Sequence, residues 1–292
     1  MKSNRRHFLA SASMGSLLPL LGPGGMKAAS VRDVWNAVKI TMVPRQLSLE
    51  DRFLMARDAG FDGVSLLYPA EGLNPKVAMN ASSRSGLPVH NVNNSRHWTT
   101  RLSAPDESVR RQSRESVEDT IRFASDVGAS SILLVVGKVT DPAHENHDQV
   151  WSRSSENIRK MIPLAARLGV RILCENVGNG FCETPESWAA FLDQFNSPWV
   201  GAFYDLGNHH SKGGADRWIR VLRSRIVKVD LKGHSSVLGK NCNLFDGDIP
   251  WETVRKELSQ IGFAGWATAE VKGGDLPRLK EVVRRMNRAM KG

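Results

Sequence analysis

The runs RILCENV (171–177), VGAFYDLGN (200–208) and RIVKVDLKG (225–233) decide the fold of this chain. Each is short and apolar, and each carries one acidic residue near its C-terminal end. Helix-like segments lie between these runs, which indicates strands that alternate with helices. The run GWATAEV (265–271) repeats the arrangement. Four predicted strands therefore carry one carboxylate each near their ends: Glu175, Asp205, Asp230 and Glu270.

The rest of the chain continues the same alternation. Four further strands are expected at 35–42, 64–68, 87–92 and 131–136, and helices at 48–59, 75–85, 106–127, 150–168, 185–195, 215–223, 250–261 and 276–290. Eight strand–helix units without a linker predict an α/β fold, a single-domain (β/α)8 TIM barrel over residues 31–292. A doubly wound open sheet is the alternative, but no Gly-x-Gly-x-x-Gly follows the first strand. In a barrel the carboxyl ends of the strands meet at one rim, so the four carboxylates are expected there.

Residues 1–30 have the layout of an export signal. Arg5 and Arg6 precede an apolar, small-residue stretch that runs to about Leu21, as in twin-arginine (Tat) signal peptides. The stretch is shorter than the roughly 20 residues that a membrane span needs, so no stable membrane anchor is expected. The twin-arginine route carries folded proteins, which suits a protein that takes up its metal before export. We expect a periplasmic protein.

The net charge and the cysteine count limit the classes of binding partner and the disulfide bonds that this chain can have. Without residues 1–30 the net charge falls from +10 to +6, because that segment holds Lys2, Arg5, Arg6 and Lys27 and no acid. The remaining basic residues alternate with Asp and Glu along helices, which indicates solvated faces and no nucleic-acid surface. Three cysteines, Cys174, Cys182 and Cys242, permit one disulfide and leave an odd thiol. Cys174 is expected in the core, and assembly of identical copies stays open.

With these motifs in hand, the chain resembles the xylose-isomerase-like TIM-barrel superfamily, in particular its sugar (phosphate) isomerases and epimerases. The resemblance spans the chain after the signal. Its most specific parts are ENV (175–177), YDLGN (204–208), DGDIPW (246–251) and GWATAE (265–270). It implies one divalent metal bound at the ends of strands five to eight, with two glutamates beside the substrate as acid and base. Glu175, Asp205 and Glu270 match those positions.

The seventh strand departs from the pattern. The family commonly shows His-x-Lys-Asp where this chain has Asp230-Leu231-Lys232-Gly233. Asp230 then either completes the metal site or forms a salt bridge with a lysine. Period-two alternation puts Lys228 and Lys232 on the face of Asp230, where their charge offsets the excess negative charge. An all-carboxylate site favours Mn²⁺ or Mg²⁺.

These residues assign roles within the site. Catalysis is expected from Glu175, Glu270 and Lys232, and substrate binding from His97, Trp98, Asn208, His209 and Lys228. Removal of a proton next to a sugar carbonyl gives an enediolate, which serves isomerisation, epimerisation or elimination (a lyase outcome). Because phosphorylated intermediates are mainly cytoplasmic, the substrate is expected to be an unphosphorylated sugar or a keto-glycoside.

Two other functions compete with this one. The altered seventh strand also fits a non-catalytic periplasmic sugar-binding barrel, which would bind ligand without proton exchange. A metal-dependent endonuclease of the related abasic-site family would need a cluster of metal-binding histidines and a basic DNA-facing surface. Export of the chain argues against DNA repair.

Overall fold

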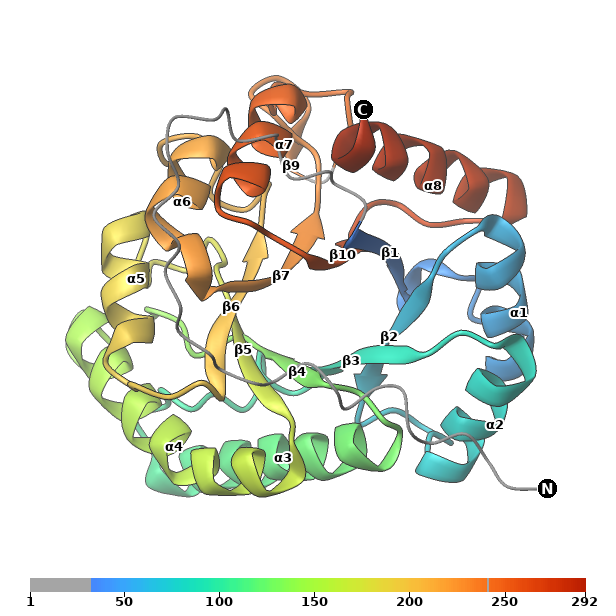
Figure 1. Cartoon of the computed structure of the whole chain (residues 1–292). Helices are drawn as coiled ribbons and strands as arrows, with labels where there is room; N and C mark the ends of the chain where they lie inside the picture. The colour runs from blue at the N-terminus through green and yellow to red at the C-terminus, as the bar shows by residue number, and fades with distance from the viewer. Residues whose placement is uncertain (1–32, 241) are drawn as a thin grey trace, which may run out of the picture.

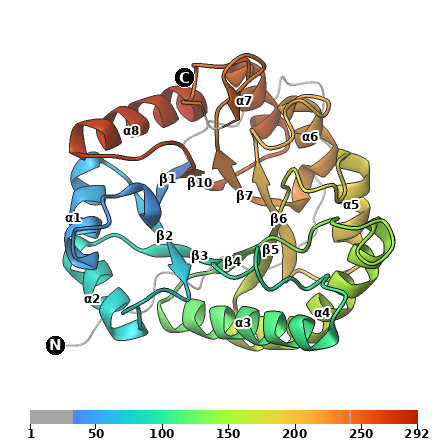
Figure 2. The same cartoon turned by 180° about the vertical axis from the view of Figure 1, so that it is seen from behind.

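The parallel sheet of this protein closes into a barrel. The computed structural model describes residues 33–240 and 242–292, and the expected export signal lies outside this part of the chain. The eight barrel strands follow one another in the order β1-β10-β7-β6-β5-β4-β3-β2, with β1 and β2 completing the ring. Figure 1 shows the strands at the centre and the helices around them, and Figure 2 shows the same ring from behind. The predicted (β/α)8 barrel is confirmed.

The barrel strands are β1 (Val34–Lys39), β2 (Gly63–Tyr68), β3 (Val89–Asn94), β4 (Ser131–Leu134), β5 (Arg171–Glu175), β6 (Val200–Asp205), β7 (Ile226–Leu231) and β10 (Gly265–Ala269). Each neighbouring pair is parallel. Parallel pairing in a closed ring brings all eight C-terminal ends to the same rim, which is the condition for the expected site.

One helix follows each strand or strand-and-loop unit. They are α1 (Leu49–Ala59), α2 (Pro75–Ser85), α3 (Glu107–Asp126), α4 (His147–Leu168), α5 (Pro185–Asp193), α6 (Ala215–Leu222), α7 (Trp251–Gln260) and α8 (Leu276–Lys291). Side-chain caps fix several starts; the Ser48 hydroxyl, for instance, accepts from the Asp51 amide at 3.1 Å. Within the described residues, none of these helices is both long and apolar enough to cross a bilayer.

Three local features differ from the sequence-based expectation. The first strand ends at Lys39 rather than at residue 42, because Ile40–Met42 forms a 3-10 helix whose Ile40 carbonyl accepts from the Arg52 side chain. Helix α4 begins three residues early, because the Asn146 side chain caps it in a reciprocal pair with Gln149. A short hairpin of β8 (His234–Ser235) and β9 (Gly239–Lys240) extends the loop after β7.

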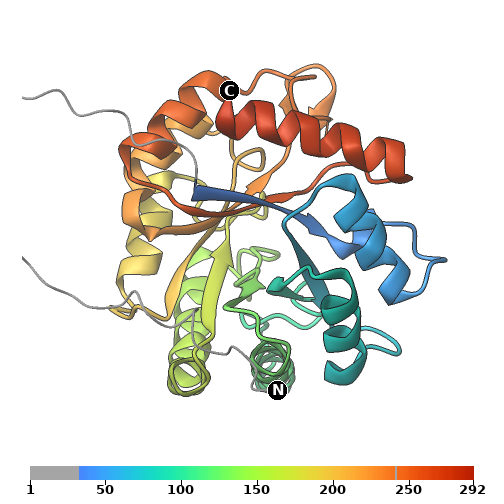
Figure 3. The same ribbon diagram turned by 45° about the vertical axis from the view of Figure 1, so that its right-hand side comes forward.

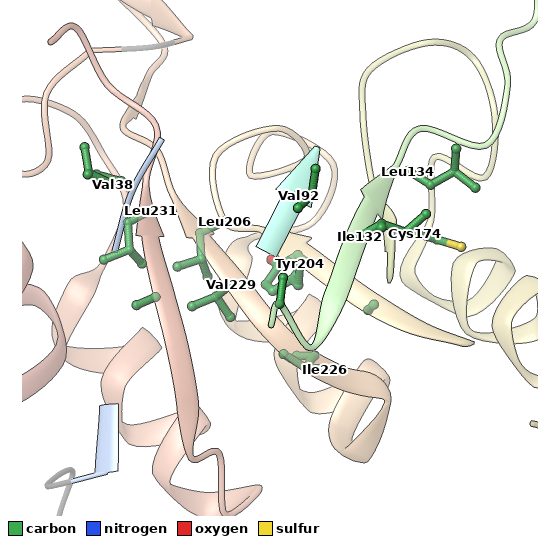
Figure 4. Close-up of a cluster of buried hydrophobic side chains, with 14 of the residues drawn as sticks. Val38, Val92, Ile132, Leu134, Cys174, Tyr204, Leu206, Ile226, Val229 and Leu231 are labelled. Atoms are coloured by element: carbon green, nitrogen blue, oxygen red, sulfur yellow. The ribbon is translucent and has the colours of Figure 1, made fainter. Parts of the chain in front are cut away.

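The core lies between the barrel and its helices. Alternate residues of the strands point outward into this layer, and Figure 4 shows a part of it with Ile132, Cys174, Tyr204, Val229 and Leu231. The intervening residues point into the lumen, where Leu133, Leu173 and Phe203 form a separate apolar cluster. Figure 3 shows the helices packed against the barrel from the side. Cys174 is buried in the outer layer as predicted, and all three cysteines are free thiols.

This division predicts the cost of a core truncation. Ile132 in β4 is fully buried, so Ile132→Ala removes apolar contacts and leaves a cavity. We expect the free energy of unfolding to fall by about 2–5 kcal/mol. Val237, at the tip of the hairpin, is 89% exposed, and Val237→Ala should change the same quantity by less than about 0.5 kcal/mol. Urea unfolding followed by circular dichroism measures both, and similar losses for the two variants would contradict this assignment of the core.

Candidate active site

Four carboxylates converge at the C-terminal rim of the barrel. Around the ring they follow the order Glu270, Asp230, Asp205, Glu175, since β10, β7, β6 and β5 are consecutive neighbours. The parallel register pairs Asp205 directly with Asp230. One oxygen from each of the four groups lies within 4.8 Å of the others. The structure therefore brings together all four acids that the sequence analysis placed at strand ends.

Two lysines lie among these acids. The Lys39 ammonium, at the end of β1, is 2.8 Å from Asp230 Oδ2 and 2.5 Å from Glu270 Oε2. The Lys232 ammonium, just after β7, is 3.1 Å from Asp205 Oδ2 and 3.0 Å from Glu270 Oε1. Glu270 is therefore held through both of its oxygens. Such paired contacts offset the cost of taking these charges out of water.

Backbone N–H groups and two asparagine side chains orient Asp205 and Glu175. Asp205 Oδ1 accepts from the backbone N–H groups of Gly207 and Asn208 at 2.8 and 2.7 Å. The Asn176 side chain bridges to the Asp205 backbone in both directions, at 3.0 and 2.8 Å. Asn208 Nδ2 lies 3.5 Å from Glu175 Oε1, while its Oδ1 accepts from Lys232 Nζ at 3.1 Å. The segment 204–208 therefore fixes Asp205 and links it to Glu175.

The environment separates the pKa values of the four acids. Burial raises the pKa of Glu175 well above its usual range, although Lys39 opposes the shift. Burial likewise raises the pKa of Asp205, and it raises that of Asp230 to about 8 despite the ion pair with Lys39. Burial acts in the same direction on Glu270, but the two lysines outweigh it and lower the pKa to about 2. Without a bound cation, the four carboxylates therefore resist being ionised all at once.

The residues present fit a divalent cation. Four carboxylates and two ammonium groups leave two unbalanced negative charges when all six are ionised. Asp230 Oδ1 is buried and has no hydrogen-bond donor among the described residues. An oxygen donor set with excess negative charge is the kind that Mg²⁺ and Mn²⁺ prefer.

A cavity of about 480 Å³ opens over this group. Glu175, Glu270, Lys39, Lys232 and Asn208 line it on the charged side. His97 and Trp98, which follow β3, line it as well, together with Leu67, Leu133 and Val177. The structure therefore places His97, Trp98 and Asn208 beside the carboxylates. Asp205 and Asp230 are completely buried beneath the cavity.

Two of the residues expected to bind substrate lie elsewhere. Lys228 points into the lumen but below the rim, where its ammonium donates to Ser131 Oγ at 2.8 Å and to the His90 carbonyl. Burial lowers the pKa of Lys228 well below its usual value. His209 is buried against Trp218, with the ring centroids 4.7 Å apart. Neither Lys228 nor His209 lines the cavity, so the structure does not place them beside the four carboxylates.

Lys39 is the site residue that the sequence analysis missed. The expected first strand runs through residue 42, which places Lys39 within the strand and gives it no role at the rim. A signal was present in the pairing of the first and last strands. Because Val38 pairs with Ala269, Lys39 lies beside Glu270. The early end of β1 places the ammonium at the rim.

A second cluster of potential metal ligands, His210, His234 and Asp248, lies in the loops after β6 and β7. Asp248 Oδ1 shares a hydrogen bond with His234 Nδ1 at 3.0 Å and lies 3.8 Å from His210 Nε2, while its Oδ2 accepts from the Ser236 amide. His210 Nδ1 accepts from the Ala215 N–H at 3.3 Å. This contact favours the tautomer of the neutral ring in which Nε2 carries the proton and points toward Asp248. These contacts fasten the segment between β7 and α7.

The ion pair of Lys39 predicts a charge-dependent stability effect. Lys39→Met leaves Asp230 buried without a cation beside it, and breaking a buried pair in this way costs about 3 kcal/mol. We expect that loss in the free energy of unfolding of the metal-free protein at about pH 9, because the wild-type Asp230 is ionised only above its pKa of about 8. The double variant Lys39→Met/Asp230→Asn has no unpaired carboxylate at position 230. Its loss in free energy of unfolding should therefore be about half that of Lys39→Met. Chemical denaturation of both variants checks this, and equal losses would contradict an electrostatic cause.

Comparison with known proteins places this geometry in a family. Residues 53–290 match the model of the xylose isomerase-like TIM barrel family. L-ribulose-5-phosphate 3-epimerase UlaE of Escherichia coli O1:K1 / APEC is 24% identical over 252 residues, which cover 80% of this chain and 88% of that protein.

Solved structures of sugar epimerases share the fold. D-allulose 3-epimerase from Methylomonas sp., in complex with D-allulose, superposes with a TM-score of 0.75 at 15% identity, covering 88% of this chain and 97% of the other. The E. coli 3-keto-D-glucoside 4-epimerase YcjR superposes with a TM-score of 0.69 at 14% identity, covering 88% and 98%. From the match over most of its length, this chain belongs to the xylose isomerase-like TIM barrel family.

Proposed function

We propose that this protein is a divalent-metal-dependent sugar isomerase or epimerase that removes a proton next to a carbonyl. One observation carries the proposal: Glu175 and Glu270 line one cavity, and the buried Asp205 and Asp230 lie between them around the rim. The relatives UlaE and D-allulose 3-epimerase are named as epimerases of sugars, which supports the same class of reaction here.

The cation would be held by Glu175, Asp205, Asp230 and Glu270. The unbalanced negative charge of this group supports Mn²⁺ or Mg²⁺ as the natural occupant. A divalent cation held there supplies a Lewis acid that polarises the sugar carbonyl and an adjacent hydroxyl.

The protein's own groups divide the remaining work. Glu175 and Glu270, at the two ends of the row of acids, face one cavity and so reach a bound sugar from different sides. One glutamate takes the proton from the carbon next to the carbonyl, and the other returns one. The Lys232 ammonium lines the same cavity and offers positive charge to the oxygen on which negative charge develops.

The other walls of the cavity suit a sugar ring. Trp98 is half-exposed and lies next to His97, with ring centroids 5.5 Å apart, so it presents an aromatic surface to the cavity. His97 is buried, and burial together with the charge of Lys39 lowers its pKa to about 3, so it is a neutral ring at physiological pH. A neutral imidazole and an indole give polar and stacking contacts without adding charge.

We propose an unphosphorylated sugar or a keto-glycoside as substrate. The solved 3-keto-D-glucoside 4-epimerase shares the fold and supports the second of these. The same proton removal leads to elimination when a leaving group lies β to the carbonyl, so a lyase product belongs to the same mechanism. A barrel that binds such sugars without chemistry is the alternative outcome.

Proton exchange in heavy water tests the proposal. The Mg²⁺-loaded protein is incubated in D₂O with a panel of keto sugars and keto-glycosides and followed by NMR. We expect deuterium at the carbon next to the carbonyl, and a loss of about a hundredfold or more in exchange rate in Glu175→Gln and in Glu270→Gln. The product identifies isomerisation, epimerisation or elimination.

Two controls give this experiment its meaning. Glu252→Gln, an exposed acid in α7, should exchange like the wild type. Removal of the cation with a chelator should stop exchange, and Mn²⁺ or Mg²⁺ should restore it. Absence of exchange with every sugar that binds measurably would favour the sugar-binding barrel.

We further propose that the protein is exported to the periplasm by the twin-arginine route, on the strength of Arg5, Arg6 and the apolar stretch that follows. Arg5→Lys/Arg6→Lys keeps the charge and removes the guanidinium pair. We expect the variant to accumulate in the cytoplasm with its N-terminal segment uncleaved. Cell fractionation with immunoblotting measures this, and unchanged export of the double variant would contradict the route.

A further inference from the structure

A second cavity lies next to the candidate active site. Its volume is about 610 Å³, and the loops that lead from β1 into α1 and from β2 into α2 form its walls. The two helices α1 and α2 are neighbours in the outer ring (Figure 1). Leu67 lines both this cavity and the one over the four carboxylates. The two cavities are therefore adjacent and share Leu67 as a wall residue.

Two arginines line the second cavity, and neither has an acidic partner. Arg45 is exposed and makes no hydrogen bond or ion pair with any described residue. Arg52 uses one guanidinium nitrogen to bind the Ile40 carbonyl, while its Nε is buried and has no acceptor in the described part of the chain. Arg45 and Arg52 line the same cavity, and burial, followed by the charge of Arg45, lowers the pKa of Arg52.

Two cations held together without a counter-ion form an unfavourable arrangement unless an anion joins them. Arg57, in the same helix as Arg52, pairs by contrast with Asp58 at 2.7 Å. Glu71 also lines the cavity but is exposed and pairs with neither arginine, so the lining keeps one net positive charge. The buried Arg52 Nε is a donor without an acceptor among the described residues, which is unfavourable unless a ligand supplies one.

The remaining walls are apolar, with Leu47, Leu73 and Val77 among them. A cavity with two guanidinium groups on an apolar lining matches a ligand that has a hydrophobic body and one oxyanion, because a guanidinium binds carboxylate or phosphate through two parallel hydrogen bonds. A neutral sugar alone would leave the arginines unpaired.

We propose that Arg45 and Arg52 form an oxyanion-binding subsite that holds a carboxylate on the distal part of the substrate. The substrate is then an acidic sugar derivative, with the reacting carbonyl over the four carboxylates and the anionic group beyond Leu67. This assignment of substrate class rests on the proposed function, whereas binding of the anion itself needs neither turnover nor a cation.

The subsite is tested with small anions on the full chain. Benzoate carries an apolar ring and a carboxylate, benzamide is its neutral counterpart, and orthophosphate is the phosphate probe. The protein is labelled with ¹⁵N, and the Arg52 Nε–H signal is assigned by its disappearance in Arg52→Lys. We expect benzoate to shift this signal and to bind about tenfold or more tightly than benzamide. Tighter binding of orthophosphate than of benzoate would overturn the carboxylate assignment and, with it, the unphosphorylated substrate.

Variants separate the subsite from general charge effects. Arg45→Met, at an exposed position, should weaken benzoate binding about tenfold without changing the thermal midpoint. Arg57→Met removes a positive charge from α1 at a position that does not line the cavity, and it should leave the affinity for benzoate unchanged. Equal binding of benzoate and benzamide, or a benzoate affinity that is indifferent to Arg45→Met, would overturn the proposal. A protein that binds benzoate as expected but exchanges no sugar proton would instead overturn the proposed reaction.

Discussion

The burial of like charges at one rim is the constraint on which the rest of this structure depends. Parallel strands in a closed barrel bring Glu175, Asp205, Asp230 and Glu270 together, and Asp205 and Asp230 are wholly removed from water. Such a group is stable only if compensating charge and hydrogen bonds accompany it. Two lysines supply part of that charge, and the backbone N–H groups after Asp205 supply directed donors. The deficit that remains makes the site receptive to a divalent cation.

In the seventh strand, the negative charge of Asp230 is compensated by Lys39 of the first strand. Where the resemblance leads one to expect a neutral histidine, this chain has Asp230, and the ion pair with Lys39 gives the two side chains no net charge together. The total charge of the site thus stays close to that of a site with a neutral ligand. Asp230 is salt-bridged to a lysine and lies within reach of the other three acids, so its role as a metal ligand stays a prediction.

Much of this architecture followed from local pattern. Apolar runs that end in an acid, separated by capped helices, were enough to predict the barrel and the convergence of the four carboxylates. Lys39 was missed because the end of its strand depends on a 3-10 turn held by Arg52, a contact that local periodicity does not encode. Lys228 shares the lumen face of Asp230, as predicted, but depth along the barrel depends on strand stagger, and it lies beside Ser131 instead of at the rim. Facing direction was predictable from the sequence, whereas depth was not.

The contact between Lys39 and Glu270 joins the first strand of the barrel to the last, across 231 positions of the chain. Neither residue has its partner until β10 has paired with β1. A chain that emerges from the ribosome therefore carries three of its four acids long before the fourth arrives, and it has no complete site until its final strand and helix have been made. Completion of the charge centre thus coincides with closure of the ring, so occupancy of the site reports a fully folded molecule. Under the proposed export of the folded protein, such a late-forming centre would tie metal loading to readiness for transport.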